Sequence, residues 1–397
     1  MSPTSLATTR GDHILHNLAQ VRRRVGRRLV LAAVKANAYG HGAVALARLI
    51  EAEGAADWLG VSQASEGLEL RRAGVGLPVL ILSPAGEDEL PAAIAAGLTL
   101  TVTDEASVAQ ASRAATALGA TAAVHLKVDT GMGRIGLPPD QAPRLAALAR
   151  DAPGVGLTGV FSHLPAADDP AQDDFTAAQI KRFAAAARAV EQVVGPVVKH
   201  LANSAAVLAH PDSWFDLVRP GIMLYGADPS PDRPCPVDLR PGLEWTSRVS
   251  FLKLLPAGQT VGYGRTWTAR RDSWIATLPV GYGDGYSRLL SNRGRALIRG
   301  RSYAIAGRIC MDQLMVDLGP TTDVAVGDRA TLIGRDGPDE ITTAELARLM
   351  DTIPYEVTCL IAPRVGRAVV GLESGMAQLA STPPSQPATF VATSRLP

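Results

Sequence analysis

The sequence predicts an α/β protein with an N-terminal (β/α)8 TIM-type barrel, followed by a smaller, mostly-β C-terminal domain. Three observations predict this fold class. Residues 28–227 alternate short apolar runs with alanine-rich, helix-like stretches. The apolar runs lack a regular polar alternation, which is typical of parallel strands buried on both faces. After about Asp228 the pattern changes to short β-like segments separated by Gly, Asp and Pro.

The eight apolar runs are Leu29–Lys35, Trp58–Ser62, Val79–Ser83, Leu98–Thr103, Ala123–Asp129, Leu157–His163, Val197–Asn203 and Leu217–Tyr225. The segments between them are long enough for crossover helices, for example Gly42–Glu53, Gln141–Arg150 and Phe175–Val194. Eight such units in about 200–250 residues suit a barrel. A doubly wound open sheet is the alternative, because periodicity alone does not exclude it.

The second half begins with a proline-rich stretch, DPSPDRPCPVDLRPG, that reads as a linker. The β-like segments after it are Trp245–Leu255, Trp274–Val280, Arg295–Ile298, Leu314–Leu318 and Ala330–Ile333. One good helix is predicted at Thr343–Asp351, capped by Thr342 or Thr343. We therefore expect a barrel domain at 1–233, a β domain at 234–373, and a disordered tail at 374–397, rich in Ser, Thr and Pro.

Composition excludes several classes of protein. The 397 residues are 47% hydrophobic and 19% charged, with a net charge of +1, so neither nucleic acid nor membrane is an expected partner. The three cysteines are widely spaced, which indicates a reducing compartment and no metal site. No secretory signal and no apolar run of about 20 residues is visible, so a cytoplasmic location is expected. The arginine run at 22–28 reads as a solvated helix face.

Polar residues gather where the predicted barrel strands end, which is where barrels place their chemistry. The residues at these strand ends are Lys35, Lys127, Arg134, His163, Asn203, Ser204, Arg219 and Gly221. A lone lysine at a strand end is usually a rim residue that reaches solvent. With so many polar groups on one rim, a desolvated Lys35 that forms a Schiff base with a carbonyl cofactor is the natural hypothesis. A phosphate on that cofactor would sit near strands seven and eight.

Eight motifs then resemble the alanine racemase family, in order, over roughly residues 14–370. They are AVKANAYGHG (33–42), KVDTGMGRIG (127–136), HLANS (200–204), RPGIMLYG (219–226), VGYGRTW (261–267), PVGYGDGY (279–286), RICMDQ (308–313) and PYEV (354–357). The resemblance implies a pyridoxal 5'-phosphate (PLP) isomerase of the barrel-plus-β-domain type. It would interconvert L-alanine and D-alanine, and so serve D-alanine biosynthesis. One segment departs from the family pattern: TTRGDHILHN carries Arg10 and Gly11 where apolar residues are usual, which leaves the N-terminal strand open.

The resemblance also implies roles for individual residues. Lys35 would hold PLP, Arg219 would face the pyridine nitrogen, and His163 would lie against the ring. The other cofactor-binding residues would be Tyr39, Asn203, Ser204, Gly221, Ile222 and Tyr355. Arg134 and the backbone of Met311 would bind the substrate carboxylate, with Lys127, His200 and Asp312 behind them. In many members the residue at Lys127 is carbamylated and steadies the arginine.

Inversion of the α-carbon requires a proton to leave one face and return on the other. The resemblance implies that Lys35 and Tyr263 are the two acid/base groups. A free tyrosine has a pKa of about 10 and is a poor base near neutrality, so hydrogen bonds to neighbouring groups would have to assist it. The family takes this tyrosine and the methionine from a partner chain in a head-to-tail homodimer, so we expect shared active sites.

The residues of the family's entrance corridor match Asp168, Tyr282, Arg288, Arg308 and Ile353. Structural ion pairing is an equally good account of the charged ones. Two functional alternatives stay open. The first is a related PLP enzyme, either a serine or broad-specificity racemase or a basic amino-acid decarboxylase. The second is a non-enzymatic PLP-carrier protein, although a carrier needs no second domain with Tyr263.

Overall fold

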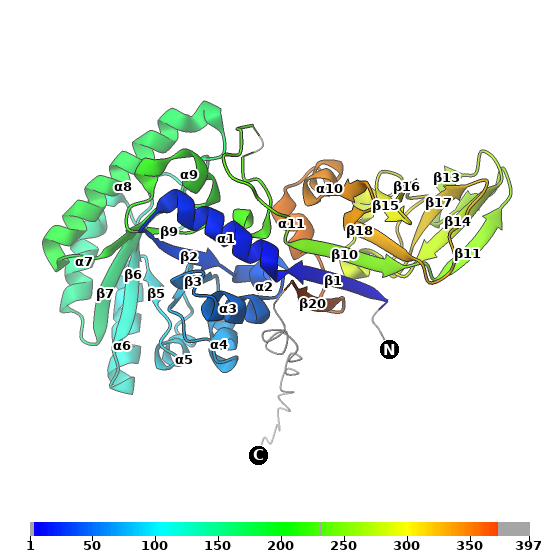
Figure 1. Cartoon of the computed structure of the whole chain (residues 1–397). Coiled ribbons are helices and arrows are strands. Elements are labelled where there is room, and N and C mark those ends of the chain that lie inside the picture. The colour runs from blue at the N-terminus through cyan, green and yellow to red at the C-terminus, as the bar shows by residue number, and fades with distance from the viewer. Residues whose placement is uncertain (1–3, 231, 372–397) are drawn as a thin grey trace, which may run out of the picture.

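The computed structural model describes residues 4–230 and 232–371. They form a barrel domain and an elongated β domain that projects from one side of it (Figure 1). The tail predicted at 374–397 lies outside the described residues. No described helix is both long and apolar enough to cross a membrane.

The barrel is built from eight parallel strands, which confirms the predicted fold class. They are β2 (Leu29–Ala33), β3 (Trp58–Val61), β4 (Val79–Ile81), β5 (Leu100–Val102), β6 (Ala122–Lys127), β7 (Val155–Phe161), β8 (Val198–His200) and β9 (Leu217–Val218). Their hydrogen-bonded order is β4-β3-β2-β9-β8-β7-β6-β5. A parallel bridge from Leu80 to Thr99, just before β5, closes the ring and rules out the open doubly wound sheet.

Helices join the strands and cover the outside of the barrel (Figure 1). They are α1 (Gly11–Val25), α3 (Ala43–Ala52), α4 (Ala64–Arg72), α5 (Leu90–Ala95), α6 (Glu105–Leu118), α7 (Ala142–Asp151), α8 (Asp173–Val194) and α9 (Ser204–Ala209). The short element α2 (Lys35–Tyr39) follows β2 and is a left-handed turn rather than a regular helix. The predicted crossover segments correspond to α3, α7 and α8.

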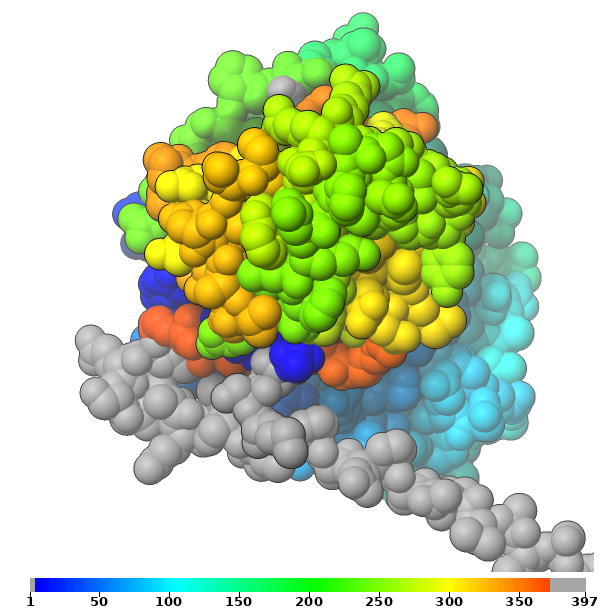
Figure 2. All heavy atoms as spheres, turned by 90° about the vertical axis from the view of Figure 1, so that its right-hand side faces the viewer, coloured from blue at the N-terminus to red at the C-terminus, as the bar shows by residue number. Residues whose placement is uncertain are grey.

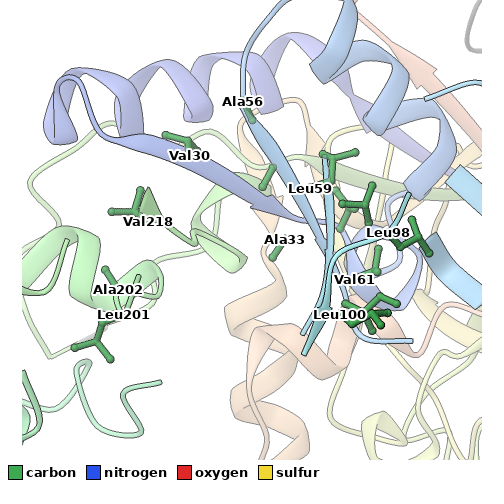
Figure 3. Close-up of a cluster of buried hydrophobic side chains, with 14 of the residues drawn as sticks. Val30, Ala33, Ala56, Leu59, Val61, Leu98, Leu100, Leu201, Ala202 and Val218 are labelled. Carbon is green, nitrogen blue, oxygen red and sulfur yellow. The ribbon is translucent and has the colours of Figure 1, made fainter. Parts of the chain in front are cut away.

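Side chains alternate along each barrel strand between the helix-facing side and the interior. Val30, Leu59, Val61 and Val218 belong to the large core between strands and helices (Figure 3). Leu31 instead packs inside the barrel, in a small cluster with two other leucines. On β6 the same alternation sends Val124 and Leu126 to the helices and leaves His125 and Lys127 for the interior. The barrel interior therefore carries polar groups on the strands that lead to the site.

The C-terminal domain has its own core around Trp245 and Tyr286. Its strands are β10 (Leu243–Arg248), β11 (Phe251–Leu255), β12 (Thr260–Val261), β13 (Trp267–Thr268), β14 (Ser273–Leu278), β15 (Arg295–Ile298), β16 (Arg301–Ala304), β17 (Leu314–Gly319), β18 (Arg329–Asp336), β19 (Asp339–Ile341) and β20 (Gly366–Val370). Two helices follow β19, α10 (Thr343–Met350) and α11 (Pro354–Cys359), and Thr342 caps the first by accepting a hydrogen bond from the Glu345 N–H.

The first strand, β1 (Ser5–Arg10), lies in the β domain and not in the barrel. It pairs antiparallel with β10 and parallel with β20, in a sheet ordered β16-β15-β18-β10-β1-β20. Figure 2 shows the blue residues near the start of the described chain at the lower edge of this domain, beside orange-red residues near its described end. The strand that sequence left open therefore exists, and it is a central strand of the C-terminal sheet.

Asn17 joins helix α1 to the segment that leaves the barrel. Its side chain is fully buried, donates to the carbonyls of Leu224 and Arg240, and accepts from the Arg240 N–H. Asn17→Ala leaves these backbone groups without partners, so we expect the free energy of unfolding to fall by roughly 2–4 kcal/mol. Urea unfolding measures this loss. Gln110→Ala, which removes only an exposed contact with Glu87, is the control and should stay within about 0.5 kcal/mol of the unmodified protein.

Candidate active site

A buried column of rings and cations fills the carboxyl end of the barrel. Phe161, at the end of β7, stacks on His200 of β8 with ring centroids 4.8 Å apart. The Lys127 amine lies 4.2 Å from the Phe161 ring centroid, and the Arg219 guanidinium lies 5.4 Å from it. The ends of β6, β8 and β9 thus direct the Lys127 amine, the His200 ring and the Arg219 guanidinium at the Phe161 ring of β7, an arrangement that favours positive charge over the ring face.

Arg219 fixes the protonation of the histidines around it. Its guanidinium donates to the carbonyls of Ser162 and Leu201, to His200 Nδ1 at 2.9 Å and to His163 Nδ1 at 3.3 Å. An arginine can only donate, so both Nδ1 atoms accept and the ring protons sit on Nε2. His200 Nε2 then donates to His125 Nδ1 at 2.9 Å.

Burial lowers the pKa of Arg219 and of the three histidines in this network. It lowers the pKa of Arg219 to about 9, which still leaves the guanidinium charged at neutral pH. Burial, and then the Arg219 charge, lower the pKa of His163, of His200 and of His125, the last to about 3. The three imidazoles are therefore neutral, and a permanent cation lies next to them.

Lys35 follows β2 directly and begins an unusual turn. Ala36, Asn37, Ala38 and Tyr39 all have φ near +50°, in the left-handed region that non-glycine residues rarely occupy. This conformation costs roughly 1–2 kcal/mol per residue, so neighbouring side chains must hold it. Asn37 accepts from the Ala43 N–H, and the Ala36 N–H donates to Glu66.

The Lys35 amine has no hydrogen bond or ion pair within the described part of the chain. Its pKa is lowered mainly by burial and then by Arg134, and Glu66 opposes the shift. Lys127 is more deeply buried, only 3% exposed, and its pKa is lowered further by burial and by Arg219. The site is thus a cationic pocket whose amines are biased toward the free base, which favours an anionic and electrophilic ligand.

Hydroxyl groups and backbone N–H groups collect beside Lys35. Tyr39 packs against Tyr225 at 4.8 Å and Tyr355 at 5.9 Å, centroid to centroid. Ser204 Oγ accepts from the Gly221 N–H at 2.8 Å. A Cβ at Gly221 would lie 2.5 Å from the Tyr39 hydroxyl oxygen, so any larger residue here would have to displace the Tyr39 ring. Burial raises the pKa of both Tyr39 and Tyr355, the latter to about 12, so the two hydroxyls keep their protons and can donate.

Two loops complete the barrel side of the site. Asp129 accepts from the N–H groups of Gly131, Met132 and Gly133, and so shapes the loop that presents Arg134 at the surface. Asn203 caps α9 through the Ala206 N–H and donates to the Leu164 carbonyl, which joins the ends of β7 and β8. Ile222 is buried beside Gly221.

The predicted residues of the C-terminal domain lie on its surface. Exposure is 69% for Tyr263, 54% for Met311, 56% for Ile353 and 43% for Tyr282. Figure 1 shows β13, just after Tyr263, in the part of the β domain that projects away from the barrel. Arg288, Arg308 and Asp312 of this domain are also exposed, and Asp312 pairs with Arg364 at 2.8 Å. Asp168, the predicted entrance residue on the barrel side, is exposed as well.

One chain thus brings together the predicted barrel residues around Lys35, together with Tyr355, and no hydrogen bond or ion pair among the described residues joins Tyr263 or Met311 to them. Sequence reasoning missed two residues of this site, His125 and Glu66. His125 occupies an interior position two residues before Lys127 on β6, and that spacing was the available signal. Glu66 follows Gln63 by three residues at the start of α4, a capping-box spacing.

Comparison with known proteins gives a consistent result over both domains. A family model for the alanine racemase N-terminal domain matches residues 10–229, and one for the C-terminal domain matches residues 242–369. An alanine racemase from Cutibacterium acnes is 51% identical over 90% of this chain and 96% of its own length. An alanine racemase from Symbiobacterium thermophilum is 46% identical over 85% of this chain and 89% of its own length. The solved alanine racemase from a D-cycloserine-producing Streptomyces lavendulae has a TM-score of 0.88 at 36% identity, over 95% of this chain and 99% of that one.

Proposed function

The chain belongs to the alanine racemase family, and from this membership we propose that it interconverts L-alanine and D-alanine with PLP bound at Lys35. The observation that carries the proposal is the Lys35 amine, which has no partner among the described residues and lies in a cationic pocket at the barrel mouth. An amine whose pKa is lowered by burial and by neighbouring cations is suited to bind a carbonyl group on an anionic cofactor.

The donors present fit PLP. The hydroxyls of Tyr39 and Tyr355 and the guanidinium of Arg134 have no hydrogen-bond partner in the described ranges. Tyr39, Ser204, Gly221, Ile222 and Tyr355 would hold the phosphate, and Asn203 would support that side of the site. When bound, PLP supplies delocalisation of the negative charge left on the α-carbon after proton removal.

Arg219 would face the pyridine nitrogen and His163 the ring. Because Arg219 stays charged at neutral pH, it would donate a hydrogen bond to that nitrogen without giving up its proton. Charge would therefore be delocalised into the ring less completely than beside a carboxylic acid. We expect this pairing to limit side reactions such as transamination.

Two groups would move the α-proton. Lys35 would serve one face of the α-carbon, and Tyr263 would serve the other. Arg134 and the Met311 backbone would hold the substrate carboxylate. The residues that would support these groups are Lys127, His200 and Asp312.

The second face requires a second copy of the chain. Tyr263 and Met311 are exposed and lie in the other domain, and no hydrogen bond or ion pair among the described residues joins them to Lys35. We propose a head-to-tail homodimer in which each site takes Lys35 from one copy and Tyr263 from its partner. The entrance to the shared site would then be bordered by exposed residues, namely Tyr282, Arg288, Arg308, Asp168 and Ile353.

Turnover of each alanine enantiomer tests the function. PLP-loaded protein is incubated in D2O with L- or D-alanine, and chiral chromatography with mass spectrometry follows inversion and deuterium incorporation. Formation of the opposite enantiomer with one deuterium is expected from both. Release of CO2 would indicate a decarboxylase, and PLP binding without any exchange would indicate a carrier. Faster turnover of serine than alanine would reassign the substrate.

Gly221→Ala should weaken PLP binding without blocking its attachment. The added methyl would overlap the Tyr39 hydroxyl and displace the ring that faces the phosphate. Overpacking of this kind costs about 1–3 kcal/mol, so we expect PLP to dissociate roughly tenfold more readily. Dialysis followed by visible absorbance measures the retained cofactor.

Gly156→Ala is the matched control for this substitution. Gly156 lies near the start of β7, and its added methyl would meet Thr121 at an ordinary 3.5 Å. We expect Gly156→Ala to retain PLP like the unmodified protein and Gly221→Ala to lose it. Equal retention in both would contradict the placement of the phosphate beside Gly221.

A further inference from the structure

Glu66 connects the ends of two barrel strands at the lysine. It lies in the first turn of α4, and its carboxylate accepts from the Ala36 N–H at 2.6 Å and from the Ser62 N–H at 2.7 Å. A third N–H, that of Gln63, reaches the same carboxylate at 3.1 Å. Ala36 directly follows Lys35, and Ser62 directly follows β3. One side chain therefore fixes the backbone on the carboxyl side of Lys35 against the neighbouring strand.

The residue that Glu66 holds is the first of the left-handed turn. Ala36 has φ of 52° and ψ of 51°, and the next three residues repeat this geometry. The far end of the turn is held by other groups, because Arg367 Nε donates to the Gly40 carbonyl and Asn37 caps α3. At Ala36 the side chain of Glu66 is the hydrogen-bond partner of the amide. Loss of that contact would free the turn at the point where it sets the direction of Lys35.

The same carboxylate contributes charge at the amine. The charged and titratable groups that act on Lys35 are Arg134, Glu66, Cys359 and Arg219. Glu66 is the only carboxylate in that set, and both arginines oppose it. We propose that Glu66 is a positioning residue for Lys35, whose carboxylate fixes the lysine backbone and supplies the negative charge that offsets the arginines around the amine. The inference deepens the proposed function and rests on Lys35 as the residue that takes PLP.

Attachment of PLP to PLP-free protein provides the test. Only the unprotonated amine attacks the PLP carbonyl, so the rate of attachment, followed by visible absorbance, rises with pH to a plateau. The midpoint of the profile reports the charge on Lys35, and the plateau reports its placement. The variants are Glu66→Gln, which keeps the size, removes the charge and leaves one accepting oxygen in place of two, and Glu66→Asp, which keeps the charge and shortens the reach. Glu69→Gln, on the same helix and exposed, is the matched control.

The two variants are expected to separate the two effects. Glu66 raises the pKa of Lys35, so removing its charge in Glu66→Gln lowers that pKa and moves the midpoint to lower pH. Below the midpoint, each pKa unit changes the free-amine fraction about tenfold, so relative to its own plateau the variant reacts several-fold faster there. Glu66→Asp should keep the midpoint of the unmodified protein and show a several-fold lower plateau, because its shorter side chain cannot span all three N–H groups.

Each outcome decides the inference. A midpoint for Glu66→Gln equal to that of Glu69→Gln would overturn it, as would an unchanged plateau in Glu66→Asp. If Glu66→Gln fails to fold by circular dichroism, the plateau of Glu66→Asp decides alone. Absence of attachment in the unmodified protein, checked by borohydride reduction and peptide mass mapping at Lys35, would instead refute the proposed function, so the two failures are distinguishable.

Discussion

Lys35→Ala is expected to remove both racemisation and the visible absorbance of lysine-linked PLP. The substitution deletes the amine that attaches the cofactor and the acid/base group for one face of the α-carbon. Loss of a general base alone typically costs about 10²–10⁴-fold in rate, and loss of the attachment adds to it. Racemisation measured by chiral chromatography should therefore fall below detection at ordinary protein concentrations.

The control for this experiment is Lys181→Ala, which removes an exposed lysine from α8 on the outside of the barrel. It should keep its absorbance and its activity. After borohydride reduction, PLP should appear on Lys35 in the control and the unmodified protein. Covalent PLP found instead on Lys127, with activity retained in Lys35→Ala, would contradict the assignment.

Tyr263→Phe is expected to retain PLP and to lose racemisation by about 10²–10⁴-fold. Only the phenolic oxygen is removed, and that oxygen is the proposed acid/base group for the second face. The overall equilibrium constrains kcat/KM to fall equally in both directions. Exchange of the α-proton with D2O is free of this constraint. It should persist for the enantiomer whose proton Lys35 removes and fall sharply for the other.

Small and equal losses of exchange for both enantiomers would reject the tyrosine as a base. Tyr303→Phe, on β16 of the same domain, is the control and should behave like the unmodified protein. Mixing the Lys35→Ala and Tyr263→Phe chains then tests the shared site. Half of the randomly formed dimers are mixed, and each has one intact site, so activity should recover to about a quarter. No recovery would place both groups in one chain.

Sequence alone predicted the barrel well, because each strand is a short apolar run whose position is fixed by its own residues. Leu29–Lys35 and Ala123–Asp129, for example, contain β2 and most of β6. The structure ends most strands earlier than predicted. Residues such as Lys35 have left the sheet, because the chain turns at the strand end to present them. The cationic rim was predicted for the same reason, since its members occupy strand ends.

Features that depend on distant partners could not be predicted. The segment Trp245–Leu255 was expected as one strand, and it divides into β10 and β11, which pair in different sheets. The local sequence KANAY (35–39) does not indicate four left-handed residues, because the contacts that stabilise this conformation come from distant side chains, those of Glu66 and Arg367. The location of β1 depends on pairing with β10 and β20, so its local composition, with Arg10 at its end, gave little signal.

The position of β1 has a consequence for biogenesis. Leu6 is aligned with Thr246 on one side and with Gly366 on the other, so β1 completes its pairing only after β10 and then the last described strand, β20, have been made. The C-terminal lobe expressed alone would have a vacancy between two strands, with two exposed edges inviting aggregation. An amino-terminal tag or truncation near residue 5 would therefore damage the lobe farthest from it in sequence. Such long-range closure also slows folding.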